Sequence, residues 1–581
     1  MLYGQDRPER LCCWQLPTGS VAAMSDEERP AHGGAQAVAA ARKHGVATMF
    51  TLSGGHVFPL YDGAVTADPP MPIIDVRHEQ TAVFAAEATA RLTRTPGLAV
   101  LTAGPGVTNG VSAVTTAHFN GSPLVVLAGR APDGRWGSGS LQELDHPPLL
   151  APVTKRAWTE HVPGRVGTAV DTAFAVAGAR HRGPVFLDAS LEALFGAGDP
   201  AGPGVTATHG PQAPDAPDPD AIAAIARLLR AASRPVLVLG SDVWLDRADH
   251  AARAAAERLA LPVIANGQGR GILPAGHPLL VTRARAAALG EADLVIVAGT
   301  PLDFRLGYGR FGGRNGTPPA AVVHLADAAD QVASHCELAG SAAGELAAIF
   351  TGLASEAAST GSAAGGWTHD WLPRLQALST GALAADAELL RSDARPIHPL
   401  RIYGELSGLL EPDAIVIGDG GDFVSYAGKY VEPQQPGGWL DPGPYGCLGT
   451  GLGYAIAARV ARPQSQVVLL LGDGAAGFSL MDADTLVRHG LPVVMICGNN
   501  GIWGLEKHPM QALYGYDVAA DLQPGCRYDQ VVAALGGRGE LVTDPADIGP
   551  ALRRAFASGE PYLVNVVTDP KDAYPRSTTG V

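Results

Sequence analysis

The sequence lacks the features that would place this protein outside the cell or in a membrane. Its 581 residues contain only six cysteines, which are scattered except for Cys12-Cys13 and include no CxxC pair. This scarcity excludes a disulfide framework and a cysteine-rich metal site, and it predicts a reducing, cytoplasmic location. No apolar run reaches the length of a membrane span, and residues 1–19 lack the apolar segment of a signal peptide. We therefore expect no membrane partner, and Met24 is a second candidate start.

Basic residues are also fewer than acidic residues. The net charge is −15 and the pI is about 5.5, which argues against a nucleic-acid partner but leaves room for local basic patches that bind a charged ligand. Hydrophobic residues, by contrast, make up 46% of the chain, enough for large buried cores. At the usual ~100–200 residues per domain, the length predicts about three domains.

Short apolar runs alternate with helical patterns along most of the chain, which is typical of doubly wound α/β domains with parallel sheets. We predict three such domains, at residues 35–195, 221–352 and 397–569. The predicted strands are residues 46–52, 73–76, 99–102, 124–128 and 185–187 in the first domain, 236–239, 262–265, 294–298 and 322–325 in the second, and 415–417, 467–471 and 491–497 in the third. The remaining segments are expected to be a disordered extension (1–34), linkers (196–220 and 353–396) and a tail or lid (570–581).

The third domain carries a polar motif at the ends of two predicted buried strands. The first of these strands ends at Gly472-Asp473-Gly474, a helical pattern follows at residues 478–489, and the next strand ends at Gly498-Asn499-Asn500. In a right-handed βαβ unit both strand ends lie at the same edge of the sheet, so Asp473 and Asn500 can meet in space. A carboxylate and an amide oxygen suit Mg²⁺ or Ca²⁺, and the glycines let backbone N–H groups approach a phosphate. The alternative is an ordinary surface turn.

The spacing of GDG and NN resembles the signature of thiamine-diphosphate-dependent enzymes, and the resemblance extends from about residue 35 to residue 569. It implies that Asp473, the Asn500 side chain and the Ile502 carbonyl hold Mg²⁺ against the diphosphate of the cofactor. It also implies a pyrimidine-binding first domain, a central nucleotide-binding-like domain and a diphosphate-binding third domain. In that family the cofactor lies between the first domain of one subunit and the third domain of its neighbour. We therefore expect a homodimer at least, and a homotetramer as the common assembly.

Glu79 is the candidate for the acid that activates the aminopyrimidine of the cofactor. It stands in Arg77-His78-Glu79-Gln80, between a predicted strand and a helical pattern at residues 81–92, and this stretch resembles the RHEQ motif of the family. The alternative is a glutamate that stabilises a helix N-terminus by a few tenths of a kcal/mol. The resemblance further implies that Leu448 supports the bent cofactor and that the Gly446 carbonyl accepts from its amino group. Other cofactor contacts are expected from Gly421, Asp422, Phe423, Gly472, Gly474, Ala475 and Trp503.

Two subfamilies compete, acetolactate synthase and 2-hydroxyacyl-CoA lyase. Leu141-Gln142-Glu143, Thr154-Lys155 and Asp303-Phe304-Arg305 resemble synthase motifs. After Asn500, however, the chain has Glu506 where synthases have valine. A lyase needs a protic group there, because the substrate hydroxyl loses a proton when the C–C bond breaks and the remaining carbon then gains one. We therefore predict a lyase that cleaves short 2-hydroxyacyl-CoA to formyl-CoA and an aldehyde or ketone, reversibly, with Glu506 as proton shuttle.

Alternative roles stay open for several residues. Glu506 has the alternatives of an ion pair with Lys507 or a solvated helix charge. His56 and Gln142 are predicted catalytic residues on first-domain loops, although a lone histidine is more often structural. Leu141 and Leu505 are expected to limit the acyl chain, and Asn120 to contact the substrate.

The central domain contains candidate residues for binding a nucleotide. Arginines at strand ends suit phosphates and an aspartate suits ribose or adenine, with solvated surface charge as the competing interpretation. The candidate nucleotide-binding residues are Arg283, Arg285, Gly299, Asp303, Arg305 and Asp327. Synthases carry FAD there and lyases of this type carry ADP, and the sequence does not separate the two. For the whole chain, acetolactate synthase and a catalytically inactive homologue are the alternatives to the lyase.

Overall fold

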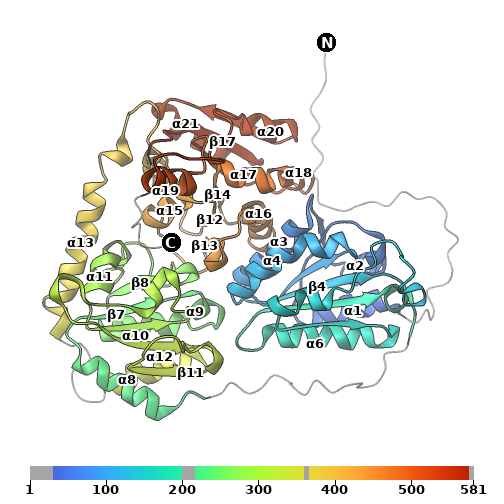
Figure 1. Cartoon of the computed structure of the whole chain (residues 1–581), viewed down its shortest axis with the longest axis horizontal. Coiled ribbons are helices and arrows are strands. Elements are labelled where there is room, and N and C mark those ends of the chain that lie inside the picture. Colours follow the sequence, from blue (N-terminus) through green and yellow to red (C-terminus); the bar gives the residue numbers. More distant parts are fainter. Residues whose placement is uncertain (1–30, 199–215, 359–365, 573, 575–581) are drawn as a thin grey trace.

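A computed structural model describes residues 31–198, 216–358, 366–572 and 574. These residues form three α/β domains, each built on one parallel sheet of five or six strands, so the predicted fold class is confirmed. In Figure 1 the C-terminal domain (orange to red) lies at the top, the central domain (green to yellow) at the lower left and the N-terminal domain (blue to teal) at the lower right. No helix in the described ranges is long and apolar enough to cross a bilayer.

The N-terminal domain has the strand order β2-β1-β3-β4-β6-β5. Alternate residues of its central strand β3 face the two sides of the sheet. Leu98 and Val100 join the core beneath helices α1, α2 and α6, while Ala99 and Leu101 join the core beneath α3 and α4. Its elements are α1 (Gly33–Lys43), β1 (Met49–Thr51), α2 (Phe58–Thr66), β2 (Ile73–Asp75), α3 (Glu79–Thr93), β3 (Gly97–Leu101), α4 (Pro105–Phe119), β4 (Leu124–Arg130), α5 (Pro147–Leu150), β5 (Arg156–Glu160), α6 (Val166–Gly178), β6 (Pro184–Ser190) and α7 (Leu191–Phe195).

The central domain has the strand order β11-β10-β9-β7-β8. Its strands are almost entirely buried, as expected where helices cover both faces of a parallel sheet. Its elements are α8 (Pro219–Ala231), β7 (Pro235–Leu239), α9 (Ser241–Leu245), α10 (Asp249–Leu259), β8 (Val263–Ala265), α11 (Arg285–Glu291), β9 (Leu294–Ala298), β10 (Ala321–Ala326), β11 (Gly340–Ala343), α12 (Leu346–Ala358) and α13 (Trp371–Ala385).

The C-terminal domain has the strand order β13-β12-β14-β15-β17-β16. In the register of β14 and β15, Gly472 lies opposite Gly498, so these two strands end level with each other. Its elements are α14 (Leu400–Leu406), β12 (Ile415–Asp419), α15 (Asp422–Tyr430), β13 (Trp439–Leu440), α16 (Thr450–Ala461), β14 (Val467–Gly472), α17 (Asp473–Ser479), α18 (Ala483–Arg488), β15 (Val494–Asn499), α19 (Gly504–Tyr514), α20 (Tyr528–Ala534), β16 (Arg538–Val542), α21 (Pro545–Ala557) and β17 (Tyr562–Val567).

Helices α3 and α16 join the N-terminal and C-terminal domains through one continuous core. Gly453 makes the close approach possible, because a Cβ there would lie 2.7 Å from the Cβ of Phe84. The ring of Phe84 meets the edge of Tyr454 with centroids 6.0 Å apart. The Tyr454 hydroxyl donates to the fully buried Glu87 at 2.8 Å, and Arg91 lies 3.7 Å from the same carboxylate. The N-terminal and C-terminal domains of one chain are therefore packed against each other through buried, paired groups.

The structure corrects several predicted elements. The sequence patterns did not identify β5, β11, β13, β16 and β17. Strands β5 and β16 are half-exposed edge strands without a clear apolar run, and β13 is only two residues long. The predicted helix 478–489 is only partly present, because α17 begins at Asp473 and ends at Ser479, a short turn follows, and α18 covers Ala483–Arg488. The Asp482 carboxylate then accepts from Thr81 Oγ1 at 2.6 Å, which fixes this break against the N-terminal domain.

The segments between the domains differ in their structure from the simple linkers we expected. Residues 353–396 include the end of α12 and all of α13, and Trp371 and Leu375 of α13 belong to the central core. Helix α1 begins at Gly33, within the expected extension 1–34. Most of that extension, residues 199–215 of the 196–220 linker and residues 575–581 of the tail lie outside the described residues. Within the tail, the Tyr574 ring packs edge-on against Tyr426 at 5.0 Å.

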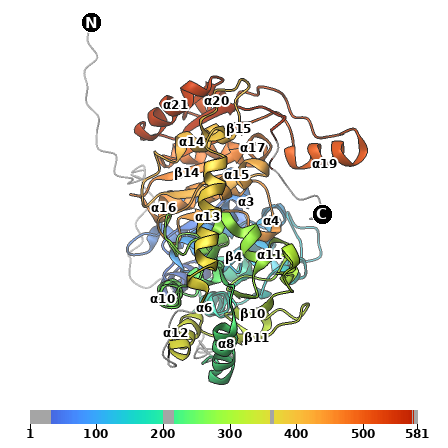
Figure 2. The same cartoon turned by 90° about the vertical axis from the view of Figure 1, so that its left-hand side faces the viewer.

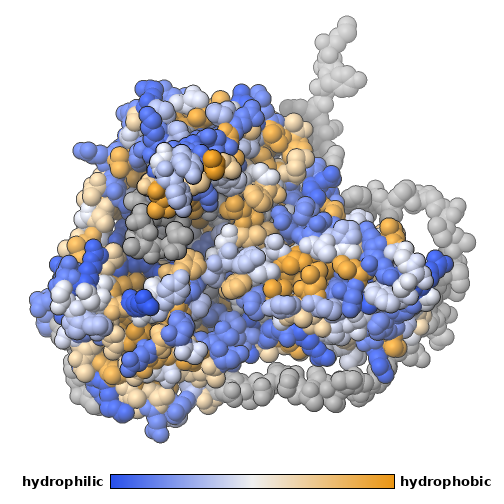
Figure 3. Space-filling model, viewed as in Figure 1, coloured by the Kyte–Doolittle hydropathy of each residue, from blue (hydrophilic) through white to orange (hydrophobic). Residues whose placement is uncertain are grey.

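The surface shows two features that bear on assembly. Helix α19 stands well away from the body of the molecule in Figure 2. Figure 3 shows hydrophobic residues gathered on the face of the N-terminal domain around α4 and β4. Large hydrophobic side chains are exposed in all of these regions and near the GDG motif, including Phe58, Phe119, Leu141, Phe478, Met481, Leu513 and Tyr514.

Candidate active site

The ends of β14 and β15 bring Asp473 and the Asn499-Asn500 loop together, as the βαβ argument predicts. Asp473 is buried, and its carboxylate accepts from the backbone N–H of Gly474 at 3.0 Å and from that of Gly501 at 2.7 Å. Burial raises the pKa of Asp473 to about 6, although the backbone donors act in the opposite direction. The Asn500 amide oxygen accepts from the Ile502 N–H at 3.2 Å. Two hard oxygen donors thus lie at one edge of the sheet.

A cavity of about 490 Å³ opens at this edge, between the C-terminal and central domains. Glycines bring the backbone close to bulky neighbours, since a Cβ on Gly474 would lie 2.3 Å from the Trp503 ring and one on Gly421 would lie 2.7 Å from Leu505. The predicted cofactor and metal residues that line the cavity are Gly421, Asp422, Phe423, Gly446, Leu448, Gly472, Asp473, Gly474, Ala475, Asn500, Ile502 and Trp503. The structure therefore gathers all of these residues around one space, with Glu79 as the exception.

Asp419 organises the loop that carries Gly446 and Leu448, and sequence reasoning missed it. This fully buried carboxylate ends β12 and accepts from the N–H groups of Gly449 at 3.1 Å and Gly451 at 2.8 Å. Burial raises the pKa of Asp419 to about 7, although both donors act against that shift. The contact fixes the start of α16 and hence the backbone on either side of Leu448. The one local signal is an aspartate just after a buried apolar run, and by itself it does not distinguish Asp419 from an ordinary strand end.

Glu506 and Leu505 reach the same cavity from the first turn of α19. Glu506 is exposed, and no ion pair in the described ranges involves it. The alternative of a pair with Lys507 is wrong, because the Lys507 ammonium lies 2.9 Å from Asp517 and 2.5 Å from Asp521. A carboxyl group with no cationic partner therefore stands beside the motif residues.

Glu79 lies at the edge of the N-terminal sheet, as the first residue of α3. It is buried, and its carboxylate accepts from the Asn109 side chain at 3.0 Å. Asn109 belongs to the loop-and-helix segment 102–109, so that segment holds the carboxylate in place. Glu79 does not line the cavity of its own chain. This separation agrees with the prediction that two subunits complete the site, which stays a prediction.

His56, Leu141 and Gln142 gather near Glu79 at the same sheet edge. The His56 ring bonds to the Thr102 hydroxyl at 3.1 Å, and burial lowers the pKa of His56 despite a hydrogen bond with the Leu141 backbone. Gln142 has a positive φ of 61° and packs over Gly104, where a Cβ would lie 2.8 Å from that of Gln142. The Leu141 side chain is exposed. Their catalytic and substrate-binding roles stay predictions.

The buried His146 stabilises a loop at this edge of the sheet, and it was not predicted from the sequence. Its Nε2 accepts from the Gly104 N–H at 2.9 Å, so Nδ1 carries the proton that it donates to Asp188 at 2.8 Å. His146 and Asp188 are both fully buried. This arrangement fixes the loop around Gly104 and, through it, the positions of Gln142 and Asn109.

Comparison with known families decides what these sites belong to. Residues 31–149, 222–351 and 419–566 match, in turn, the N-terminal TPP binding domain, the central domain and the C-terminal TPP binding domain of the thiamine pyrophosphate enzymes. This chain belongs to the thiamine pyrophosphate enzymes. It is therefore expected to use thiamine pyrophosphate, also called thiamine diphosphate, and the recognition made from the sequence is confirmed.

Relatives of this thiamine pyrophosphate enzyme carry two different names. The acetolactate synthase large subunit IlvG of Mycobacterium tuberculosis is 49% identical over 558 residues, which cover 95% of this chain and 99% of the relative. The 2-hydroxyacyl-CoA lyase 2 of Caenorhabditis elegans is 34% identical, covering 94% of this chain and 91% of the relative. The human 2-hydroxyacyl-CoA lyase 2 is 31% identical, covering 93% and 91%. Both candidate subfamilies therefore occur among its full-length relatives.

A second cavity, of about 380 Å³, lies where all three domains of the enzyme meet. Of the predicted nucleotide-binding residues, only Gly299 and Arg305 line it. Asn120, predicted to contact the substrate, lines this second cavity as well. Its amide donates to Glu87 at 2.8 Å, so its side chain is engaged in the domain interface.

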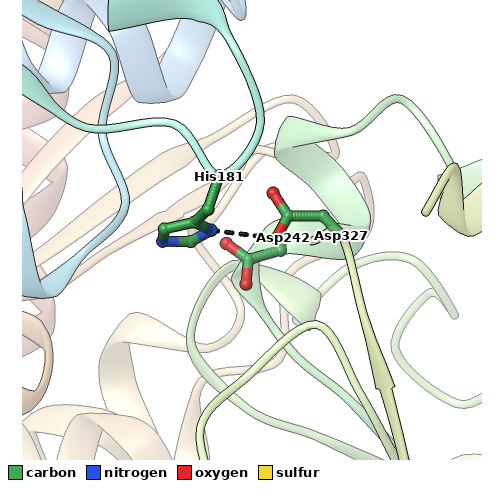
Figure 4. A group of neighbouring side chains, drawn as sticks. All are labelled: His181, Asp242 and Asp327. Atoms are coloured by element: carbon green, nitrogen blue, oxygen red, sulfur yellow. Dashed lines mark hydrogen bonds and ion pairs between the residues drawn. The ribbon is translucent and has the colours of Figure 1, made fainter. Parts of the chain in front are cut away.

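Asp327 belongs to a charged cluster beside the second cavity (Figure 4). It is buried, lies 2.9 Å from His181 of the N-terminal domain and 3.5 Å from Arg182. Asp242 of α9 faces the same imidazole in Figure 4. Burial and the charge of Asp327 raise the pKa of Asp242 to about 7. Ion pairs in this cluster join the N-terminal domain to the central domain.

The other predicted nucleotide residues are engaged with protein groups of the central and C-terminal domains. Asp303 binds Arg305 through both carboxylate oxygens. Arg283 pairs with Glu432 at 2.9 Å, and Arg285 donates to the Arg305 carbonyl at 2.7 Å. The arginines therefore gather on the side of the central domain that faces the C-terminal domain. Their role in nucleotide binding stays a prediction.

Proposed function

We propose that this enzyme is a thiamine-diphosphate-dependent carbon–carbon lyase that cleaves short 2-hydroxyacyl-CoA to formyl-CoA and an aldehyde or ketone. The observation that carries the proposal is the carboxyl group of Glu506, which lines one cavity with Asp473 and Asn500. The relatives named 2-hydroxyacyl-CoA lyase agree with it.

The residues around the cavity suit a divalent ion and a diphosphate. Asp473, the Asn500 amide and the Ile502 carbonyl would hold Mg²⁺, because hard oxygen ligands are what this ion prefers and phosphate oxygens complete its shell. The glycines at 472, 474 and 421 line the cavity, and a Cβ on Gly472 would meet no other atom within 4 Å, so its backbone is open to phosphate oxygens. Leu448 and Gly446 would contact the rings of the cofactor. When bound, thiamine diphosphate supplies a carbon nucleophile for the carbonyl group and accepts the electrons of the broken C–C bond.

Glu79 would complete the site from a second subunit. Its carboxylate is buried and held by Asn109, which suits a group that exchanges one proton with a ring nitrogen. Exposed apolar side chains such as Phe119, Leu141 and Phe478 are what a subunit interface would cover. We therefore infer a homodimer as the smallest active unit.

Glu506 would move the proton of the substrate. Its carboxylate would take the hydroxyl proton as the aldehyde or ketone leaves, and return it to the carbon that becomes the formyl group. Such a general acid–base group contributes roughly 10²–10⁴-fold to a rate. Leu505, one residue earlier, would limit the length of the acyl chain.

The second candidate function is acetolactate synthase, favoured by the 49% identity to the mycobacterial synthase subunit. In that reaction two pyruvate molecules are joined with loss of carbon dioxide. A protic group beside the reacting carbon would then work against the enzyme, because it would quench the carbon that has to attack the second pyruvate.

Product analysis distinguishes the two functions. The enzyme loaded with thiamine diphosphate and Mg²⁺ is incubated with 2-hydroxyisobutyryl-CoA, with lactoyl-CoA and, separately, with pyruvate. The lyase yields formyl-CoA with acetone from the first substrate and with acetaldehyde from the second. Acetolactate from pyruvate, with both thioesters left intact, would overturn the lyase and support the synthase.

A further inference from the structure

Arg270 is an unusual cation in this acidic protein. It lines the first cavity together with Arg305, and its guanidinium lies over the Trp439 ring, 4.9 Å from the centroid. Within the described residues its side chain has no hydrogen bond or ion pair. The side chain is half-buried, so water only partly replaces a missing partner. Arginine is the side chain best suited to binding a phosphate through two parallel hydrogen bonds.

Three further arginines crowd around this cation. Arg285 donates to the backbone of Arg305, and burial together with the charges of Arg270 and Arg305 lowers the pKa of Arg285 to about 10. The positive charge of Arg283 also repels the Arg270 guanidinium. The like charges therefore repel one another beside the cavity between the central and C-terminal domains.

The carboxylates nearby do not balance these cations. Asp303 is held by Arg305 and Glu432 by Arg283. The Asp441 carboxylate accepts from the Trp439 indole at 2.7 Å and from the Gly443 N–H at 3.0 Å, so its oxygens are already engaged. Within the part of the chain that the structure describes, three carboxylates thus lie near four guanidinium groups, and neither Arg270 nor Arg285 forms an ion pair with one of them. An anionic ligand would supply the missing charge.

We propose that Arg270, Arg285 and Arg305 bind the phosphate groups of the substrate, which are those of the coenzyme A portion of a thioester. The inference rests on the proposed function and adds the residues that would select its substrate class. Arg270 and Arg305 line the cavity that holds the Asp473 motif, so a phosphate held by them lets a thioester reach along that cavity to the reacting centre. A small 2-ketoacid carries one carboxylate, which can pair with one of these cations but not with all three.

The phosphates of a resident nucleotide are the other possible source of the same chemistry. Arg305 also lines the second cavity, which borders the central domain, where FAD or ADP was expected. Arg270 does not line that cavity, and it is the cation with the fewest partners. The location of Arg270 therefore favours the substrate over a resident nucleotide, and the experiment below treats the two separately.

Binding of the carrier without turnover tests the proposal. Isothermal titration of the enzyme loaded with thiamine diphosphate and Mg²⁺ compares coenzyme A, dephospho-coenzyme A and pantetheine, which differ in their phosphate groups. Charge-assisted hydrogen bonds predict that the wild type binds coenzyme A about tenfold to a hundredfold more tightly than pantetheine. The R270Q/R285Q variant is expected to lose that difference while binding pantetheine as before. Arg253→Gln, an exposed arginine of α10 paired with Glu257, is the matched control and should bind like the wild type.

The result is interpretable even if the double variant folds poorly. Arg270→Gln alone provides a milder change, and raising the salt concentration should weaken coenzyme A binding to the wild type but not pantetheine binding. Equal binding of coenzyme A by the wild type and both variants would overturn the proposal. So would a loss of ADP or FAD binding with coenzyme A binding unchanged, which would assign the arginines to a resident nucleotide. Either result leaves the lyase reaction itself to be judged by its products.

Discussion

The carboxylate of Asp473 accepts a hydrogen bond from the backbone N–H of Gly501 at 2.7 Å. The two residues belong to the ends of neighbouring parallel strands, and this bond joins the GDG turn to the Asn499-Asn500 loop. A single short contact thus holds the oxygen donors of the proposed metal site within reach of one another. From this loop the chain continues directly into α19, which carries Glu506.

Removing the metal or its principal ligand should release the cofactor. We expect Asp473→Ala to weaken binding of thiamine diphosphate by at least about tenfold, because a divalent ion bridges the carboxylate and the diphosphate. Dialysis of the wild type against EDTA should have the same effect, and added Mg²⁺ should restore binding. Quenching of the fluorescence of Trp503, which lines the cavity, reports the binding. The exposed Asp547→Asn is the control, and cofactor binding that survives both treatments would contradict the metal assignment.

Glu79→Gln should separate cofactor binding from activation. Glutamine keeps the size of the side chain and the contact with Asn109 but cannot exchange a proton. We expect turnover to fall by roughly 10²–10⁴-fold while the affinity for thiamine diphosphate changes little. Steady-state kinetics and cofactor titration on the same preparation measure the two effects. Asn109→Ala should give a smaller loss, because the carboxylate remains but loses its orientation. Undiminished turnover in E79Q would remove Glu79 from the mechanism.

Glu506→Gln should impair proton transfer without disturbing the cofactor. The side chain is exposed and is not paired with Lys507. Its replacement should therefore change the free energy of unfolding very little. We expect lyase turnover to fall by roughly 10²-fold or more, with unchanged cofactor affinity and melting temperature. The exposed Glu411→Gln provides a charge-matched control. If E506Q instead gained acetolactate production from pyruvate, the carboxyl group would be the element that sets the lyase apart from a synthase.

Asp419 should prove to be a positioning residue for the loop around Leu448. Asp419→Asn replaces one acceptor oxygen by an N–H₂ group that faces a backbone N–H, at a cost of about 1–3 kcal/mol in unfolding free energy. We also expect weaker thiamine diphosphate binding and an altered near-ultraviolet circular dichroism signal of the bound cofactor. Leu448→Ala should change that signal without the same loss of thermal stability. Thermal unfolding and dichroism of both variants check the distinction, and a D419N protein with normal dichroism would contradict it.

The cluster of His181, Asp242 and Asp327 should make the contact between the N-terminal and central domains depend on pH. Burial alone would lower the pKa of His181, but its bond to Asp327 and the charges of both aspartates raise it to about 9. A raised histidine pKa contributes stability that is complete below the ordinary value of about 6.5 and is lost as the pH rises through about 9. Thermal unfolding of the wild type should therefore show a lower midpoint at pH 9.5 than at pH 6.5. In His181→Gln this part of the pH dependence should disappear; an unchanged profile would show that the cluster does not govern it.

Much of the site could be predicted from the sequence, because its motifs are made of residues that lie close together in the chain. The strands that precede Gly472 and Gly498 were found because each is a continuous apolar run, and the meeting of Asp473 with the Asn500 loop followed from βαβ geometry. Asp419 and His146 were not found, because their roles depend on hydrogen bonds to backbone groups 30 or 42 residues away. No local pattern distinguishes such a residue from an ordinary strand end or loop.

The three α/β domains and the motif that resembles a diphosphate-binding site could be predicted without coordinates, since buried parallel strands and their glycine turns are local features of the chain. Three features became visible in the three-dimensional arrangement alone. Glu506 lines the Asp473 cavity while Lys507 pairs with Asp517 and Asp521, and Glu79 does not line the cavity of its own chain. Arg270 lines that cavity with no hydrogen-bond or ion-pair partner among the described residues. The reason is physical: local patterns depend on periodicity, whereas charge pairing and access depend on which distant segments share a space.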